Sequence, residues 1–384
     1  MGRAERRLLV SASEVATRRR GAYSSAMARP LALHSQHVAA HARFGERGGA
    51  EVVLGHAPID EEYRALVGAV GVADRSHRAI FRVVGPEAKL YLHGLVTNDV
   101  KGVPAGKGNY TSIINARGKM LGDARLLVLS DEDLLLDLEP EAREQSLAHL
   151  DQLLISEDCT LSDATGEWLI FGAYGPRARE AVERALGVSL PPLALHDNAL
   201  VPLDGGGALA VGAAPAGVAG VDVILDPSSG PGFFAALVAA ARELGGLPVG
   251  EDALDAARIH QVVPRYGAEM NESTIPLEAN LDLAISYTKG CYVGQEVIAK
   301  ATYRGQVRRK LGQLRVSPGV TPGAELLDAE KVVGTVVSVL DPDPGGGPAL
   351  ALAYVRQDRL AAGTRLAVSG GGEATITWAP APKE

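Results

Sequence analysis

The 384-residue chain contains only two cysteines, Cys159 and Cys291, and aromatic residues make up only 4% of it. Two cysteines cannot build a disulfide framework, so the sequence favours a reducing compartment, and we expect a cytoplasmic protein. No apolar run approaches the ~20 residues that a helix needs to cross a bilayer, so we expect no contact with a membrane. With so few rings, the core must consist mainly of leucine, valine, alanine and isoleucine.

An excess of basic residues is also absent. The formal net charge is −8 at pH 7, which argues against a nucleic-acid-binding protein. Hydrophobic residues make up 46% and charged residues 22%, which is ordinary usage for a globular protein. Single hydrophobic cores stop growing near roughly 250–300 residues, so a chain of this length predicts two or three lobes.

The first 28 residues differ from the rest of the chain. They are rich in arginine, serine and alanine and carry little apolar patterning, which predicts a disordered tail. Two other interpretations stay open: Met27 is the true start of the protein, or the segment is an organelle transit peptide.

One local pattern occurs twice. A predicted strand is followed by Gly-Pro and then by a predicted helix, over Ala79–Leu95 and again over Trp168–Leu186. Proline suits the first turn of a helix because its missing N–H would have no partner there. The recurrence suggests two related α+β lobes, with chance recurrence of a common turn as the alternative. From Lys310 onward, short strands alternate with Gly/Pro turns, which predicts a small β-barrel or sandwich that begins near Val307.

The most unusual stretch is Lys289–Glu296, which reads K-G-C-Y-V-G-Q-E. Glycines on both sides of Cys291 allow tight backbone geometry and the close approach of a ligand. A lysine and a helix N-terminus near a thiol favour the reactive thiolate. The alternative is a buried cysteine that acts as a small hydrophobic residue.

This stretch resembles the K-G-C-Y-x-G-Q-E motif of the YgfZ family, the folate-binding branch of the superfamily that includes the glycine-cleavage T protein. Further segments are similar to that superfamily and extend the resemblance over most of residues 70–310: Val83–Ala88, Leu95–Val100, Gly108–Tyr110, Asn115–Met120, Tyr266–Met270 and Pro276–Leu281.

The resemblance implies an α+β fold in which three domains form a ring around a folate channel. Two α+β lobes would be interleaved along the chain, residues 29–80 with 165–255 and residues 81–164 with 256–306. Residues 307–384 would form a C-terminal β-barrel. The implied ligand is tetrahydrofolate or a one-carbon derivative of it.

The implied function is that of a YgfZ-type accessory protein, which supports the assembly or repair of iron–sulfur enzymes and is not a conventional enzyme. Cys291 would be the working thiol and Lys289 its electrostatic partner. The folate contacts expected from the resemblance are eight residues: Tyr110, Asn115, Arg258, His260, Tyr266, Tyr292, Gln295 and Glu296.

Two positions depart from the T protein. The resemblance implies that a glutamate of T proteins binds the pterin. In this sequence His260 occupies the position of that glutamate. An imidazole cannot accept two parallel hydrogen bonds as a carboxylate does, although an ordinary helix histidine is the alternative. The T-protein stretch N-x-x-G-G-x-x-D-D also has Gly122 in place of its first acid and keeps Asp123 as its second.

These departures and the cysteine motif favour the YgfZ branch. The alternative function is a folate-dependent aminomethyltransferase that uses Asp123 as a catalytic residue. This activity would be lost if the first acid, which is Gly122 here, were the essential one. Asp123 is otherwise a strand-edge acid that pairs with Arg125 or with a backbone N–H. His34, His37 and His41 share one face of a helix, but no carboxylate or cysteine accompanies them, so we expect no metal site.

Overall fold

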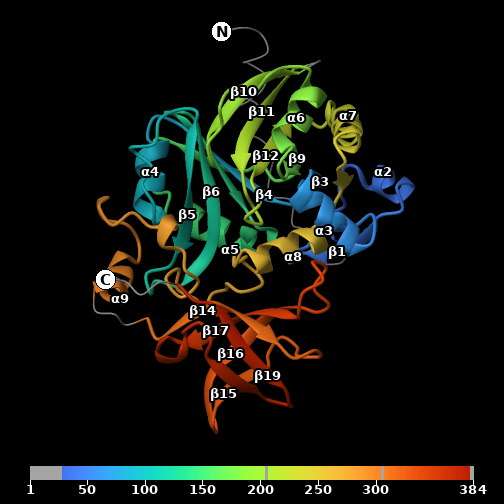
Figure 1. Ribbon diagram of the computed structural model, residues 1–384. Coiled ribbons are helices and arrows are strands. Elements are labelled where there is room, and N and C mark those ends of the chain that lie inside the picture. Colours follow the sequence, from blue (N-terminus) through green and yellow to red (C-terminus); the bar gives the residue numbers. More distant parts are fainter. Residues whose placement is uncertain (1–27, 204–205, 304–306, 381–384) are drawn as a thin grey trace.

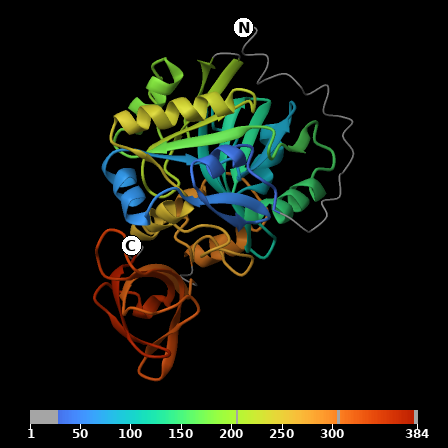
Figure 2. The ribbon, with the colours of Figure 1, turned by 90° about the vertical axis from the view of Figure 1, so that its right-hand side faces the viewer.

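The computed structural model describes residues 28–203, 206–303 and 307–380. Two sheets lie side by side in the upper part of the molecule, and a β-barrel lies below them (Figure 1). The view turned by 90° shows the barrel set apart beneath both sheets (Figure 2). The predicted α+β fold with a C-terminal barrel is therefore confirmed. The tail and the alternative start at Met27 fall on residues outside those described, apart from Ala28.

The first lobe is built on a five-stranded antiparallel sheet in the order β5-β6-β7-β4-β8. Helices α4 (Ala88–Leu95) and α5 (Arg143–Gln152) belong to this lobe. A short 3-10 turn, Pro140–Ala142, leads into α5 at Arg143. The strands are β4 (Ala79–Val84), β5 (Lys107–Ile114), β6 (Met120–Ser130), β7 (Asp133–Leu138) and β8 (Thr160–Asp163).

The second lobe is built on a six-stranded sheet in the order β10-β11-β12-β9-β3-β13. Helices α3, α6 and α7 pack on it: Ile59–Gly68, Ala178–Leu186 and Gly230–Glu243. Its strands are β3 (Gly71–Asp74), β9 (Leu169–Tyr174), β10 (Asn198–Leu203), β11 (Gly206–Ala213), β12 (Gly220–Leu225) and β13 (Leu247–Pro248). The strands of the two sheets thus alternate in blocks along the chain.

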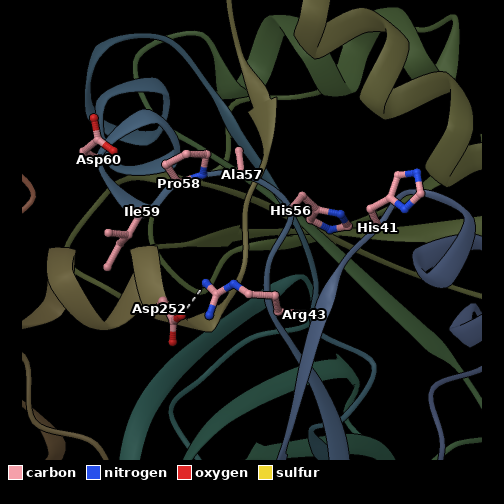
Figure 3. A pocket seen from close by; sticks show the side chains of 8 residues that line it. All are labelled: His41, Arg43, His56, Ala57, Pro58, Ile59, Asp60 and Asp252. Atoms are coloured by element: carbon pink, nitrogen blue, oxygen red, sulfur yellow. Dashed lines mark hydrogen bonds and ion pairs between the residues drawn. The ribbon is translucent and has the colours of Figure 1, made fainter.

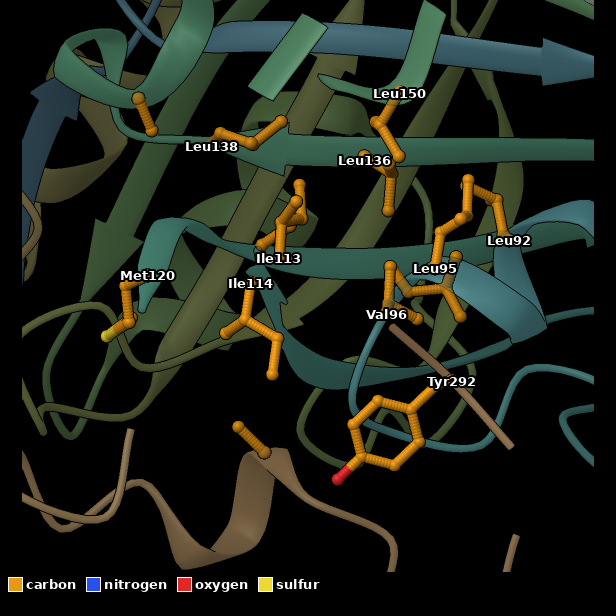
Figure 4. Packing of buried hydrophobic residues seen from close by; sticks show 14 of the residues in the cluster. Leu92, Leu95, Val96, Ile113, Ile114, Met120, Leu136, Leu138, Leu150 and Tyr292 are labelled. Atoms are coloured by element: carbon orange, nitrogen blue, oxygen red, sulfur yellow. The ribbon is translucent and has the colours of Figure 1, made fainter. Parts of the chain in front are cut away.

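Smaller elements connect these bodies. They are α2 (His34–Ala39), the β1–β2 ribbon (Arg43–Arg47 and Ala50–Gly55), α8 (Glu251–His260), η3 (Asp282–Ala284) and α9 (Gln295–Tyr303). After α8 the chain returns to the first lobe and adds apolar side chains to its core. Figure 4 shows one of them, Tyr292, beside Val96 and Ile114.

The barrel closes in the order β14-β17-β16-β15-β18-β19. A closed barrel leaves no sheet edge unpaired. Its interior contains valine, leucine, alanine and isoleucine, as expected for a chain with few aromatic residues. The strands are β14 (Arg309–Val316), β15 (Glu325–Asp328), β16 (Lys331–Leu340), β17 (Leu350–Arg356), β18 (Arg365–Val368) and β19 (Glu373–Trp378), with a 3-10 turn η4 at Gln357–Arg359.

The recurring strand–Gly-Pro–helix pattern forms the same unit in both lobes. Gly85 links β4 to α4 with φ +142°, and Gly175 links β9 to α6 with φ +121°. A Cβ atom at Gly175 would lie 2.5 Å from the carbonyl oxygen of Leu66, and one at Gly85 would lie 2.5 Å from that of Asp158. Both turns therefore require glycine for conformation and for space.

No helix among the described residues combines the length and the apolar character that a membrane span requires.

We expect Gly175→Ala to lower the free energy of unfolding by about 2–3 kcal/mol, because a Cβ atom there is strained and meets backbone. The measurement is urea denaturation followed by circular dichroism. Gly232→Ala is the control, because Gly232 lies in α7 and a Cβ atom there meets nothing within 4 Å. Equal stability of the two variants would contradict this account of the turn.

Candidate functional site

A cavity of about 490 Å³ lies between the two lobes. Strands β5 and β6 line it from the first lobe, β12 and the segments 195–196 and 214–216 line it from the second, and α8 and Leu281 complete the wall. Its volume is within the range of roughly 300–1,000 Å³ that is typical of small-molecule sites.

Asp123 and Tyr110 face each other in this cavity. They lie on the paired strands β6 and β5, and the Tyr110 hydroxyl donates to Asp123 Oδ2 at 2.6 Å. Asp123 Oδ1 is buried and has no hydrogen-bond partner among the described residues. Burial raises the pKa of Asp123 to about 6, although the Tyr110 hydrogen bond opposes this shift. The site therefore holds a carboxyl group that can gain or lose a proton near neutral pH.

Strand alternation decides which of positions 122 and 123 reaches the cavity. A Cβ atom at Gly122 would lie 2.7 Å from Ser146 Oγ and 2.8 Å from Ala142 Cβ, so this position faces α5 and its flank. An acid at position 122 would thus point away from the cavity. The glycine at position 122 counted against aminomethyl transfer in the sequence. Since this position faces away from the cavity, the cavity still has a carboxylate, which Asp123 supplies.

A network of buried ion pairs forms the wall around Asp123. Arg125 Nη1 lies 2.6 Å from Asp222 Oδ2, and Arg78 Nε donates to Asp137 Oδ1 at 2.5 Å. Burial alone would oppose the ionisation of Asp137, but the adjacent Arg125 and Arg78 hold its pKa below the ordinary value. Sequence reasoning had treated Arg125 only as a partner of Asp123, and missed the rest of this network, because its members come from both lobes.

Helix α8 supplies a second wall. Glu251, Leu254, Asp255 and Arg258 line the cavity with i, i+3, i+4 and i+7 spacing, which marks one face of a helix. This spacing was visible in the sequence and could have identified Glu251 and Asp255 as site residues. The structure does bring the predicted residue Arg258 into the cavity.

His260 lies outside the cavity. It is two residues beyond Arg258, so the helical rotation of 100° per residue turns it to another face. Its ring stacks on Tyr63 with centroids 5.3 Å apart, and Nε2 lies 2.9 Å from Asp343 Oδ1 in the barrel. In this structure His260 therefore forms a contact between α8 and the barrel and does not line the cavity in which a pterin contact is expected.

Two further predicted contacts also lie elsewhere. Asn115 Oδ1 accepts the N–H groups of Arg117 and Lys119 at 2.9 and 3.2 Å, which fixes the turn between β5 and β6. Tyr266 is buried in the core of the first lobe, where Gln145 Nε2 donates to its hydroxyl at 2.5 Å. Neither side chain lines the cavity: Asn115 is engaged in its own turn, and Tyr266 in the core of the first lobe.

Lys289 has a structural role in this fold. Its ammonium donates to the carbonyl oxygens of His93, Val96 and Asn98 at 2.5, 2.7 and 2.8 Å, at the C-terminal end of α4. Burial lowers the pKa of Lys289 to about 8. All three ammonium hydrogens are directed to carbonyl groups, so the expected pairing of Lys289 with the Cys291 thiol is not what the structure shows.

The rest of the Lys289–Glu296 stretch also lies outside the cavity lining. Cys291 is exposed, which excludes the alternative of a buried small hydrophobic residue. Tyr292 packs in the core, Gln295 begins α9, and the Glu296 side chain is 89% exposed. The motif thus forms the approach to α9, whereas Tyr110, Asp123 and Arg258 meet at the cavity.

The three spaced histidines do not form one cluster. His34 lies 2.8 Å from Glu51 and His37 lies 2.9 Å from Asp74, while α2 ends at Ala39, before His41. Over the described ranges, no group of three His, Cys, Asp or Glu residues could hold a metal ion.

A second hollow, of about 650 Å³, lies beside His41 and His56 (Figure 3). Arg43 crosses it to pair with Asp252 at 2.7 Å. It contains none of the residues predicted to bind folate. The cavity between the lobes is therefore the candidate site.

Two sheet-based lobes that enclose a small-molecule cavity, with a barrel beneath them, define an α+β ligand-binding protein. Residues 33–289 match the model of the GCVT N-terminal domain, and the chain belongs to this family.

Named relatives agree with this assignment. An aminomethyltransferase of Thermotoga petrophila is 29% identical over 84% of this chain and 88% of the relative. One of Rubrobacter xylanophilus is 28% identical over 91% of each chain. The structure of glycine cleavage system aminomethyltransferase T from Bartonella henselae shares the fold, with a TM-score of 0.83 and 21% identity over 91% of this chain and 97% of that one.

The raised pKa of Asp123 predicts a pH-dependent stability. The folded protein binds more protons than the unfolded chain between the unfolded pKa of 3.8 and the folded pKa of about 6, so stability falls as pH rises through this window. The variant Asp123→Asn lacks this titrating group. We therefore expect its free energy of unfolding, relative to that of the wild type, to increase by ~3 kcal/mol as the pH is raised from 3.5 to 7. Urea denaturation across this range measures the gain.

Glu296→Gln, at an exposed position, is the control for removing one acid. A stability difference between Asp123→Asn and wild type that does not change with pH would refute the raised pKa.

Proposed function

We propose that the protein is a tetrahydrofolate-dependent transferase of one-carbon units, of the aminomethyltransferase type. The observation that carries the proposal is Asp123, a buried carboxyl group with a free Oδ1, poised to titrate near neutral pH inside a cavity of ligand size. The names of the relatives support the same activity.

Members of this family use tetrahydrofolate, and the cavity has the donor set to hold it. A folate has a polar ring edge that seeks hydrogen-bond acceptors, a flat ring and an acidic tail. Asp255 would supply an acceptor and Leu254 an apolar contact. Arg265 lines the same cavity, where its Nη2 donates to Asp255 at 3.3 Å and its Nη1 lies 3.6 Å from Glu251 Oε2. Its buried Nε and Nη1 have no hydrogen-bond partner within the described part of the chain, so Arg265 would hold the tail.

Tetrahydrofolate, when bound, supplies a nucleophilic amine that accepts a one-carbon unit. Asp123 would accept a proton at Oδ1 in its ionised form, above its pKa of about 6. Tyr110 fixes the orientation of this carboxylate through Oδ2 and leaves Oδ1 to face the ligand. Burial alone would lower the pKa of Arg125, but Asp137 and Asp222 raise it, so Arg125 stays protonated. Proton transfer therefore takes place at Asp123 and not at this neighbour.

We expect Asp123→Asn to lower kcat by about 10²–10⁴-fold, since a general base contributes that much. The assay incubates the full chain with tetrahydrofolate and an aminomethylated lipoyl carrier and measures formation of methylene-tetrahydrofolate. The wild-type rate should rise with pH through about 6, and the variant should lose this rise.

In Asp123→Asn, the affinity for tetrahydrofolate should change less than kcat. The control Glu296→Gln should have the kcat and the affinity of the wild type. Absence of product with wild type would reject the transferase.

A second candidate function follows from the exposed thiol of Cys291. A thiol on the surface is accessible to another protein, which suits a YgfZ-type accessory protein that supports iron–sulfur client enzymes. In this function tetrahydrofolate would be bound in the same cavity, and the thiol would act outside it.

We expect, for the second candidate, that Cys291→Ser abolishes the rescue of iron–sulfur enzyme activity in a deletion strain. Cys159→Ser is the matched control, because Cys159 is half-buried and burial raises the pKa of its thiol to about 11. Full rescue by the Cys291→Ser variant would eliminate this candidate.

A further inference from the structure

His196 has a strained backbone at the edge of the cavity. It precedes β10, lines the cavity and has φ +69°. This is the left-handed region, which few residues other than glycine adopt, although histidine, asparagine and aspartate are enriched there. Strain of this kind persists only where the surroundings impose it, and it is concentrated at ligand sites.

Hydrogen bonds from both lobes impose this conformation. The His196 N–H donates to the carbonyl oxygen of Gly212 at 2.8 Å in the second lobe, and the Asn198 N–H donates to that of Gly106 at 2.8 Å in the first. A Cβ atom at Gly108 would lie 2.7 Å from the His196 carbonyl oxygen. The turn is thus pressed against β5, two residues from Tyr110.

The His196 imidazole lies almost parallel to the Tyr110 ring, with centroids 6.4 Å apart and an angle of 12° between the planes. Its Nδ1 is buried and has no hydrogen-bond partner among the residues that the structure describes. Burial, followed by the charge of Arg125, lowers the pKa of His196 to about 4, so the ring is neutral at pH 7.

A neutral imidazole carries one N–H donor and one acceptor nitrogen. A buried N–H without a partner is rarer than a buried acceptor without one, so the lone pair belongs on Nδ1 and the proton on Nε2. Nε2 is then a donor available to a ligand. Arg125 acts on the ring as a positive charge, and three aspartates, Asp137, Asp197 and Asp222, act in the opposite direction. The ring thus lies among charges of both signs, which suits an uncharged acceptor.

We propose that His196 is a ligand-binding and specificity-determining residue of this cavity, whose Nε2–H donates to an uncharged carbonyl oxygen of the bound tetrahydrofolate. The inference rests on the proposed function, because it names the ligand as a folate. The strain at His196 is then retained because glycine, which would fit the backbone better, could not supply the donor.

The test compares thermal unfolding of the free protein with tetrahydrofolate binding measured by calorimetry. His196→Gly should leave the melting temperature unchanged or higher, since glycine adopts a positive φ without strain. The same variant should bind tetrahydrofolate about 10-fold more weakly, the effect of losing one buried hydrogen bond. His196→Asn should bind within about 3-fold of wild type, because asparagine tolerates this conformation and keeps an N–H donor.

Ala329→Gly is the matched control. Ala329 has φ +54° in the exposed turn between β15 and β16 of the barrel, so the same relief of strain occurs far from the cavity. This variant should keep wild-type affinity.

The outcomes separate the inference from the function on which it rests. If wild type binds tetrahydrofolate and His196→Gly binds it equally tightly, the role of His196 is overturned and the proposed function stands. A lower melting temperature for His196→Gly with unchanged affinity would show a packing residue and overturns the role as well. If wild type does not bind tetrahydrofolate, the proposed function and this inference both fail.

Discussion

The ion pairs of Arg125 hold the two lobes together at the cavity. Its guanidinium donates a hydrogen bond to Asp137 within the five-stranded sheet and forms an ion pair with Asp222 in the six-stranded sheet. All three side chains are almost fully shielded from water, and an unpaired charge in such a place is costly. Separating the lobes here would leave these charges buried without partners, so the ion pairs favour the arrangement in which the cavity lies between the two sheets.

Asp123 is also shielded from water, but its pKa changes in the opposite direction to that of Asp137. Asp137 is paired with Arg125 and Arg78, which keep it ionised, whereas the hydrogen-bond partner of the Asp123 side chain within the described residues is the neutral hydroxyl of Tyr110. Desolvation therefore dominates at Asp123 and raises its pKa towards neutrality. Two carboxylates on neighbouring strands thus serve different purposes, one in structure and one available for proton transfer.

The most distinctive sequence motif and the cavity lie in different places. Lys289 closes the end of α4 through three carbonyl groups, and Tyr292 anchors the following loop in the core. These contacts place Cys291 at the surface, on the approach to α9. A short motif therefore indicates kinship and local structure more directly than it indicates which residues face the ligand.

The sequence alone determined the features that depend on neighbours in the chain. The Gly-Pro turns after β4 and β9, the strand-rich barrel and the candidates Tyr110 and Asp123 follow from turn chemistry, periodicity and resemblance. Only the tertiary structure decided that position 122 faces α5 while Asp123 faces the cavity, and that Arg258 lines the site while His260 contacts the barrel. These outcomes depend on strand register and on the face that each element turns to a distant partner, and no local pattern contains either.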